Sequence, residues 1–182
     1  MEVISTSIPD VKILHPKVFG DDRGFFLETW NRQELAAEGI DTEFVQDNHS
    51  RSSRGALRGL HYQVKQLQGK LVRVATGSVF DVAVDMRRSS ETFGRWVGMI
   101  LTEENHEIAW IPPGFAHGFL VLSDTADFLY KCTDFYAPEY ERTIRWDDPD
   151  LAIDWPVLEG TELLLSQKDG NGSSFKDAEY LP

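Results

Sequence analysis

The sequence has only one cysteine, Cys132, among its 182 residues. An intrachain disulfide is therefore impossible, and a lone thiol lacks the spaced partners of a zinc site. We expect Cys132 to be a small buried hydrophobic side chain. Without disulfides the fold depends on its hydrophobic core, and 41% hydrophobic residues are enough to build one in a chain of this length.

Basic residues are also scarce, since 18 Lys and Arg stand against 30 Asp and Glu, for a net charge of −12. Nucleic acids and anionic membranes demand a basic surface, so we expect neither as a partner. No apolar run approaches the roughly 20 residues that span a bilayer. The opening stretch MEVISTSIPDVK lacks the basic and apolar segments of a secretory signal. We expect a cytoplasmic protein.

Long amphipathic helices are missing too. One short helix is predicted in NRQELAAEGI, with Asn31 as N-cap, Glu34 at the capping-box position and Gly39 closing its C-terminus. No repeat or linker divides the chain, although DGNGSSF near its end is rich in Gly and Ser. We expect one domain over residues 1–182, with N-terminal strands and a short C-terminal tail.

Strand patterns fill most of the remaining sequence, above all between Leu71 and Thr133. Their apolar and aromatic residues are interrupted by Gly, Pro, Asn and Asp. Since no helix between them is long enough for a parallel crossover, the sheets should be antiparallel. The predicted fold is all-β, an antiparallel jelly-roll barrel with a few short helices. The stretches are LVRVATG, VFDVAVDM, WVGMILT, EIAWIPPG, GFLVLS and DFLYKCT.

Alternate residues of a strand point to the same side, which predicts the side chains that share the barrel interior. His61, His117 and Tyr130 come together there, among aromatic neighbours. By the same alternation Arg58 points to the side opposite His61. The predicted groups are His117 with Phe119 and Val121, Phe128 with Tyr130 and Cys132, His61 with Gln63, and Arg58 with Leu60 and Tyr62.

Residues 51–73 carry basic side chains and no Asp or Glu, which is unusual in so acidic a chain. One interpretation is a solvated basic edge strand that resists pairing with other chains. The other is a site for a small anion, such as a phosphorylated or nucleotide-linked ligand held by guanidinium groups. The basic residues are Arg51, Arg54, Arg58, Lys65, Lys70 and Arg73.

A histidine, a tyrosine and a lysine in one apolar interior suit proton abstraction next to a carbonyl group. The histidine acts as base, the tyrosine donates a proton and the cation stabilises the enolate oxygen. A metal site is the competing interpretation, but Gln63 stands two residues after His61, where a second histidine ligand is common. The turn in IPPGFAHGF places His117 at a barrel mouth, although a histidine there is often structural. We expect no metal.

Five further stretches carry a family pattern. The sequence resembles, from end to end, the dTDP-4-dehydrorhamnose 3,5-epimerases, a cupin-type jelly-roll family of dTDP-rhamnose biosynthesis. The stretches are FGDDRGFFLETW, FVQDNHSRSSRGALRGLHYQ, QGKLVRVATGSVFDVAVDMRRSSETFGRWVG, IPPGFAHGFLVLSDTADFLYKCTDFYAPEYERTIRWDDPDLAIDW and LSQKD.

The resemblance implies roles for five residues in a cofactor-free reaction. His61 would remove the protons at C5 and C3, and Tyr130 would return one from the opposite face. Asp169 would hydrogen-bond His61 and favour its cationic form. Lys70 would face the C4 oxygen, where negative charge develops, and His117 would lie beside the sugar.

The resemblance also implies a dTDP-sugar substrate and a homodimer in which N-terminal strands pair with the partner's sheet. Tyr136 would stack on the thymine ring. The remaining residues would hold the nucleotide and diphosphate, and they are Arg23, Glu28, Gln46, Asp47, Asn48, Arg58, Glu141 and Lys168.

Three alternatives stay open at this point. Relatives that invert only C3 or only C5 share much of the pattern, because one base can serve both positions. A metal-dependent cupin enzyme is the second alternative, and a cupin that binds nucleotide sugars without catalysis is the third.

Overall fold

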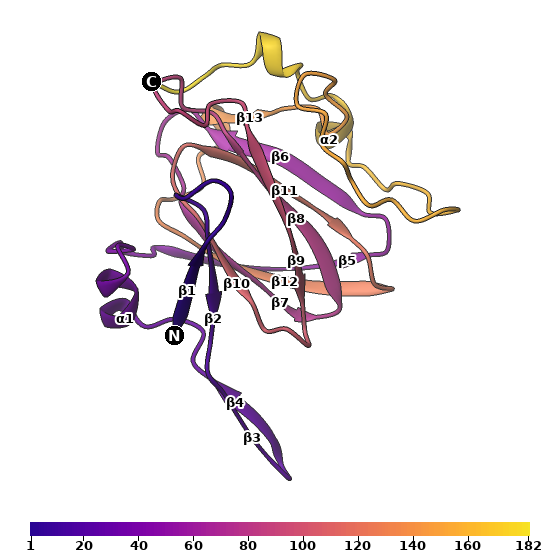
Figure 1. Cartoon of the computed structure of the whole chain (residues 1–182). Helices are drawn as coiled ribbons and strands as arrows, with labels where there is room; N and C mark the ends of the chain where they lie inside the picture. The colour runs from indigo at the N-terminus through magenta and orange to yellow at the C-terminus, as the bar shows by residue number, and fades with distance from the viewer.

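Two antiparallel β-sheets face each other in the computed structural model, which describes residues 1–182 (Figure 1). The six-stranded sheet runs, in spatial order, β1 (Glu2–Ser5), β2 (Lys12–His15), β10 (Ile108–Ile111), β7 (Lys70–Thr76), β12 (Thr125–Cys132) and β5 (Gln46–Ser53). The five-stranded sheet runs β13 (Glu141–Thr143), β6 (Leu57–Gln63), β11 (Phe115–Val121), β8 (Ser78–Asp85) and β9 (Trp96–Thr102). The predicted antiparallel strands are confirmed.

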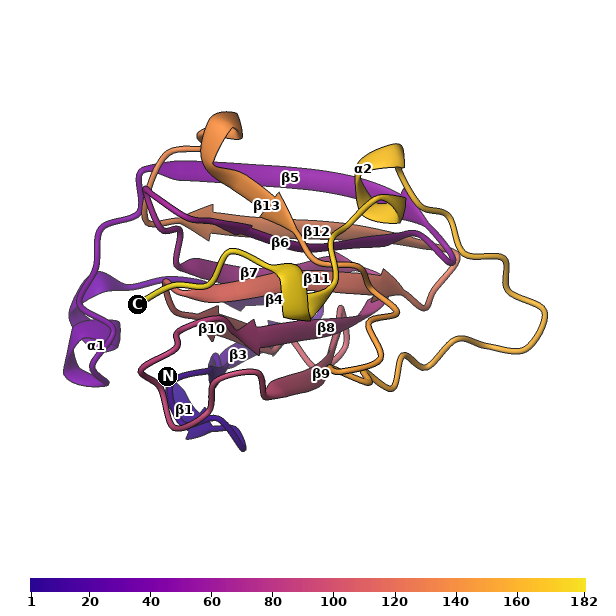
Figure 2. The ribbon, with the colours of Figure 1, turned by 90° about the horizontal axis from the view of Figure 1, so that it is seen from above.

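Four short helical segments accompany the sheets. They are α1 (Arg32–Ala37), α2 (Gln167–Gly170) and the 3₁₀ turns Pro138–Tyr140 and Phe175–Asp177. Figure 2 shows α2 at one end of the molecule, where it contacts β6. The C-terminal segment thus packs beside a central strand that carries predicted site residues.

Helix α1 begins as the sequence predicts. The side chain of Asn31 accepts hydrogen bonds from the backbone N–H of Gln33 and Glu34 at 3.0 and 3.3 Å, and Gly39 has a positive φ of 84°. The capping-box prediction for Glu34 is wrong. Its carboxylate lies 3.0 Å from the amino group of Met1, because a full positive charge attracts it more strongly than a backbone N–H does.

The space between the sheets is apolar over much of its length. Val72 and Val74 of one sheet pack against Val79 and Phe119 of the other, and Cys132 is fully buried as predicted. The rings of Phe119 and Phe128 stack at 4.2 Å between centroids. Both rings also line a cavity, so they separate the core from the open end of the barrel.

A β-bulge interrupts the pairing of β6 with β11. His61 pairs with His117, but Arg58 pairs with Phe119, so Gly59 and Leu60 together face the single Gly118. Gly59 has a φ of 122°, and a Cβ there would lie 2.5 Å from the Gly118 Cα. The bulge reverses the alternation of side chains. The prediction that Arg58 points away from His61 is therefore wrong, since both residues line the same cavity.

A separate hairpin of β3 (Val18–Asp21) and β4 (Gly24–Leu27) extends away from the two sheets (Figure 1). Its side chains pack little against the rest of the chain. The rings of Phe19, Phe25 and Phe26 are each more than half exposed. Three exposed aromatic side chains on one projecting arm form an apolar surface that is typical of contacts with another molecule.

Candidate active site

A cavity of about 560 Å³ opens between the two sheets at the end where α2 lies. Every predicted site residue lines it except Arg23, Glu28 and Asp47. The residues that it brings together are Gln46, Asn48, Arg58, His61, Lys70, His117, Tyr130, Tyr136, Glu141, Lys168 and Asp169. They come from both sheets, from the loop after β12 and from α2.

His61 and Asp169 form the first histidine–carboxylate pair of the cavity. The Nε2 atom of His61 lies 2.7 Å from the Oδ1 atom of Asp169, although the ring N–H is not aligned on that oxygen. Burial alone would raise the pKa of Asp169, but contacts from His61, Ser166 and the Gly59 N–H hold it well below its ordinary value. Asp169 is therefore a carboxylate at neutral pH, and the Nδ1 atom of His61 is left to take up a proton.

A second histidine and carboxylate lie beside the first pair. His117 and Asp81 are buried, with 2.8 Å between His117 Nε2 and Asp81 Oδ2. Burial lowers the pKa of His117, which Asp81 only partly offsets. His117 is thus neutral near pH 7 and able to donate or accept a hydrogen bond. The other oxygen of Asp81 is buried without a partner.

Lys70 and Tyr130 come from the six-stranded sheet, across the cavity from the two histidines. Lys70 is nine-tenths buried, and its burial lowers the pKa of the ammonium group. Burial also raises the pKa of Tyr130, which keeps the phenol protonated. The cavity therefore presents a histidine base on one wall and a phenol proton donor on the facing wall.

Polar side chains at the cavity mouth hold one another in place. Glu141 accepts hydrogen bonds from the Tyr136 hydroxyl at 2.9 Å and from the Lys168 ammonium at 2.8 Å. Burial raises the pKa of Glu141, but these two donors outweigh it and lower the pKa. Gln46 accepts from the backbone N–H of Tyr136 at 2.9 Å. The ring of Tyr136 is about half exposed, so one face is free to stack.

Four basic residues of the segment 51–73 fall into two groups, one outside the cavity and one inside it. Arg51 and Arg54 form ion pairs with Asp127 and Asp124 outside the cavity. Arg58 and Lys70 line the cavity, and the only hydrogen bond of the Arg58 guanidinium within the chain joins its Nε to the Ser52 hydroxyl at 3.0 Å. The anion-site interpretation therefore applies to Arg58 and Lys70, whereas the charges of Arg51 and Arg54 are balanced by Asp127 and Asp124.

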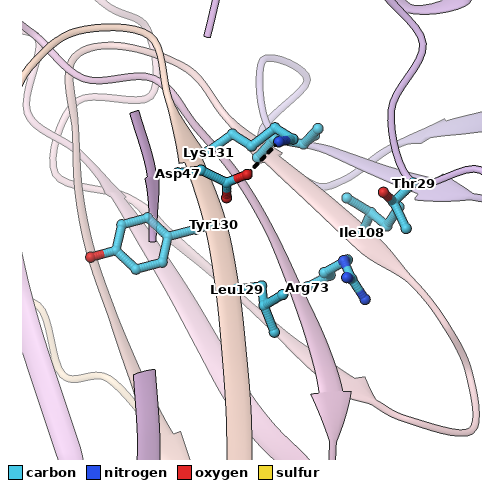
Figure 3. Close-up of a pocket in the computed structure, with 8 residues that line it drawn as sticks. Thr29, Asp47, Arg73, Ile108, Leu129, Tyr130 and Lys131 are labelled. Carbon is cyan, nitrogen blue, oxygen red and sulfur yellow. Dashed lines mark hydrogen bonds and ion pairs between the residues drawn. The ribbon is translucent and has the colours of Figure 1, made fainter. Parts of the chain in front are cut away.

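Asp47 lies on the outer side of the six-stranded sheet, and its carboxylate is 2.6 Å from the ammonium group of Lys131. Figure 3 shows this pair beside Arg73 in a small outer pocket, whereas the ring of Tyr130 points to the other side. Asp47 falls between Gln46 and Asn48 on one strand, so its side chain alternates outward. Its side chain does not reach the cavity.

Arg23 and Glu28 also lie outside the cavity. Arg23 is in the turn of the hairpin, where its side chain is 90% exposed and pairs with Asp21. Glu28 directly follows β4. Both residues therefore stand on the projecting arm, away from the site of their own chain.

Two polar residues that contact predicted site residues were not predicted from the sequence. Asp81 was detectable in principle, since it is the one acidic residue in the buried apolar run Val79–Val84 of β8. Ser166 stands three residues before Asp169 in SQKD, a pattern that indicates a helix start and not a site. No group of three or more His, Cys, Asp or Glu side chains is arranged to hold a metal ion, and no helix is long and apolar enough to cross a bilayer.

Comparison with known proteins gives full-length matches. The family model described as dTDP-4-dehydrorhamnose 3,5-epimerase matches residues 5–177. The dTDP-4-dehydrorhamnose 3,5-epimerase of Pseudomonas aeruginosa is 59% identical over 183 residues, which covers 100% of both chains.

Two solved structures superpose closely and confirm the predicted fold class. The first is a dTDP-6-deoxy-D-glucose-3,5-epimerase from Legionella pneumophila in complex with dTDP-4-keto-L-rhamnose, with a TM-score of 0.95, 54% identity and coverage of 98% of this chain and 94% of that one. The second is a dTDP-4-dehydrorhamnose 3,5-epimerase from Bacillus anthracis with TDP and PPi bound, with a TM-score of 0.90, 43% identity and coverage of 95% and 98%.

Proposed function

Since this chain belongs to the dTDP-4-dehydrorhamnose 3,5-epimerase family, its activity is that of an isomerase in dTDP-rhamnose biosynthesis, and we propose how its side chains carry it out. Of the alternatives that the sequence leaves open, the epimerase of both C3 and C5 is the one that the full-length relatives support. The proposed substrate is dTDP-4-dehydro-6-deoxy-D-glucose and the product is dTDP-4-dehydro-L-rhamnose. We propose that no metal or cofactor takes part.

His61 is the base of the proposed mechanism. Its ring removes a proton from the carbon next to the C4 ketone, and Asp169 stabilises the imidazolium that forms. The electron pair moves onto the C4 oxygen, where the nearby Lys70 ammonium stabilises the enolate. Tyr130 then delivers a proton from the facing wall, so the carbon is inverted. One observation carries this proposal, the placement of His61 with Asp169 on one wall and Tyr130 on the other.

The nucleotide binds at the cavity mouth. Arg58 is the guanidinium that meets the diphosphate, because its charge is not balanced by an acid within the chain. Tyr136 stacks on the thymine ring, held by Glu141 and Gln46. The bound dTDP-sugar and TDP of the two relatives support this class of ligand.

We further propose that the chain is a single domain that works as a homodimer. The resemblance assigns Arg23 and Glu28 to the nucleotide, but both stand on the projecting β3–β4 hairpin of their own chain. They reach a nucleotide if the hairpin enters the cavity of a second copy. Burial of the exposed Phe19, Phe25 and Phe26 against that copy favours the same arrangement.

The test is incubation with the proposed substrate in deuterated water, followed by proton NMR and mass spectrometry. The expected result is deuterium at both C3 and C5 together with the rhamno-configured product. Deuterium at one carbon only places the chain among single-position epimerases. Binding without any deuterium uptake refutes the catalytic role of His61.

A further inference from the structure

The carboxylate of Asp169 is held by a separate donor at each oxygen. Its Oδ1 atom, which faces His61, accepts the backbone N–H of Gly59 at 3.0 Å. Its Oδ2 atom accepts the hydroxyl of Ser166 at 2.5 Å. The hydroxyl in turn accepts the backbone N–H of Asp169 at 3.2 Å. Since an N–H can only donate, the single proton of Ser166 is left for the carboxylate.

The orientation of an aspartate carboxylate is weakly determined by its own side chain. Rotation about its last torsion is broad and roughly two-fold, so hydrogen bonds decide where the two oxygens point. Gly59 alone fixes one oxygen and leaves the second free to turn. The Ser166 hydroxyl supplies the missing constraint at Oδ2, and Asp169 is 4% exposed, so water has little access to replace it.

We infer that Ser166 is a positioning residue of the epimerase, whose hydroxyl fixes the Asp169 carboxylate in the orientation that brings Oδ1 against His61. The inference rests on the proposed role of His61 as base. Ser166 acts through Asp169 and has no proton transfer of its own in the reaction. The hydrogen bond also holds the pKa of Asp169 down, together with the adjacent His61 ring and the Gly59 N–H, against the opposing effect of burial.

The chain contains a matched control for the local structure. Ser174 has the same two contacts with Asp177, accepting its backbone N–H at 3.2 Å and donating to its Oδ2 at 2.7 Å. Both serines cap a short helical segment, one in SQKD and the other in SFKD. Asp177 does not line the cavity. Loss of either serine therefore removes one helix cap, but only Ser166 is linked to His61, through Asp169.

The experiment compares Ser166→Ala, Ser166→Thr and Ser174→Ala with the unsubstituted enzyme, using dTDP-4-dehydro-6-deoxy-D-glucose. We expect Ser166→Ala to lower kcat by about tenfold or more, the scale of one hydrogen bond to a charged group, with little change in KM. The acid limb of its kcat/KM profile should move to lower pH, because a carboxylate that no longer faces His61 stabilises the imidazolium less. Ser166→Thr, which keeps the hydroxyl, should restore both values, and Ser174→Ala should change neither.

The pH profile reports on every titratable group of the cavity, so the coupling to Asp169 needs its own measurement. Besides Asp169, these groups are Arg58 and His61 on β6, His117 on β11, Lys70 on β7, Tyr130 on β12, Tyr136 in the loop after β12, Glu141 on β13 and Lys168 on α2. In an Asp169→Ala background, removal of the Ser166 hydroxyl should have no additional effect on kcat.

Two results would overturn the inference. One is an unchanged kcat and pH profile in Ser166→Ala with a melting temperature lowered as in Ser174→Ala, which reduces Ser166 to a helix cap. The other is an equal loss of kcat with and without Asp169. Deuterium uptake by the unsubstituted enzyme is measured first, since failure there refutes the proposed function and only differences between variants concern Ser166.

Discussion

His61 and His117 face each other on neighbouring strands β6 and β11, and the Nε2 atom of each ring lies against a different buried carboxylate. Their environments separate their roles. The side chain of His61 is 23% exposed toward the cavity, whereas that of His117 is 7% exposed. Burial lowers the pKa of His117, so it stays neutral beside His61, the proposed base. Two adjacent imidazolium charges are thereby avoided.

Replacing His61 with Asn removes the base from its wall of the cavity. We expect deuterium uptake at C3 and C5 to disappear and turnover to fall by about 10²- to 10⁴-fold, the usual contribution of general acid–base catalysis. Proton NMR in deuterated water measures both. His49→Asn breaks a histidine–carboxylate pair of 2.8 Å outside the cavity and serves as the control. Normal turnover in His61→Asn would assign the base to another group.

Replacing Tyr130 with Phe leaves the base in place and removes the donor on the facing wall. Deuterium should still enter at one position, because His61 removes a proton and returns one to the same face. Inversion there should be blocked, which NMR detects as labelled substrate without product. Tyr180→Phe is the matched control, since its hydroxyl donates to the Phe175 carbonyl at 2.7 Å away from the cavity. Full inversion by Tyr130→Phe would identify a different acid.

Replacing Arg58 with Ala should act on binding more than on chemistry. Loss of a guanidinium contact to a diphosphate is expected to raise the dissociation constant for dTDP by about 10- to 100-fold. Calorimetry measures this constant. Arg54→Ala is the control from the same basic segment, because its partner is Asp124 on the surface. Equal affinities for the two variants would contradict the diphosphate role of Arg58.

Mixing two inactive variants tests whether the hairpin serves a second copy. Arg23→Glu damages the donated arm and His61→Asn damages the receiving cavity, so a mixed dimer has one intact site. After equilibration of equal amounts, about a quarter of all sites should be active, because about half of the dimers are mixed. Each variant alone is expected to have little activity. An inactive mixture whose chains have exchanged, shown by mass spectrometry, would place Arg23 in its own site.

Replacing Lys70 with Met separates stability from activity. Burial lowers the pKa of Lys70 below its ordinary value of 10.5, so the folded chain opposes the charged form. That penalty is present at neutral pH. It declines as the pH rises through the lowered pKa of the folded chain, and it is gone above the unfolded value. We expect Lys70→Met to lower turnover by more than tenfold and to raise Tm by about 2–4 °C per kcal/mol gained. A lower Tm with unimpaired turnover would contradict the enolate role.

Strand alternation predicts most of the interior of the barrel correctly. It places His61, His117 and Tyr130 together, as the cavity lining shows, because β11 and β12 keep a continuous register with β8 and β5. It fails for Arg58, because the bulge at Gly59 shifts the register. The glycine in RGLHYQ is the one local signal of that bulge. Asp47 is the reverse case, since alternation places it outside and only the resemblance included it.

Contacts that depend on distant packing could not be derived from local sequence. The Gly59 N–H and the carboxylate of Asp169 are separated by 110 positions, and neither stretch carries a pattern that points to the other. The resemblance supplied the pairing of Asp169 with His61 but not Ser166 as its second support. The Glu34 carboxylate likewise pairs with the amino group of Met1 and not with a backbone N–H of its own helix, because the N-terminal strand lies beside it.

The placement of Asp169 after the last strand has a consequence for biosynthesis. Both sheets are complete once residue 143 has been made, but Leu151, Trp155 and Leu181 are still needed to bury the core of the five-stranded sheet. The same late segment carries Asp169, which accepts the Gly59 N–H of β6. The residues made after 143 therefore complete the core and bring the carboxylate to His61 together, so a chain terminated before them lacks both.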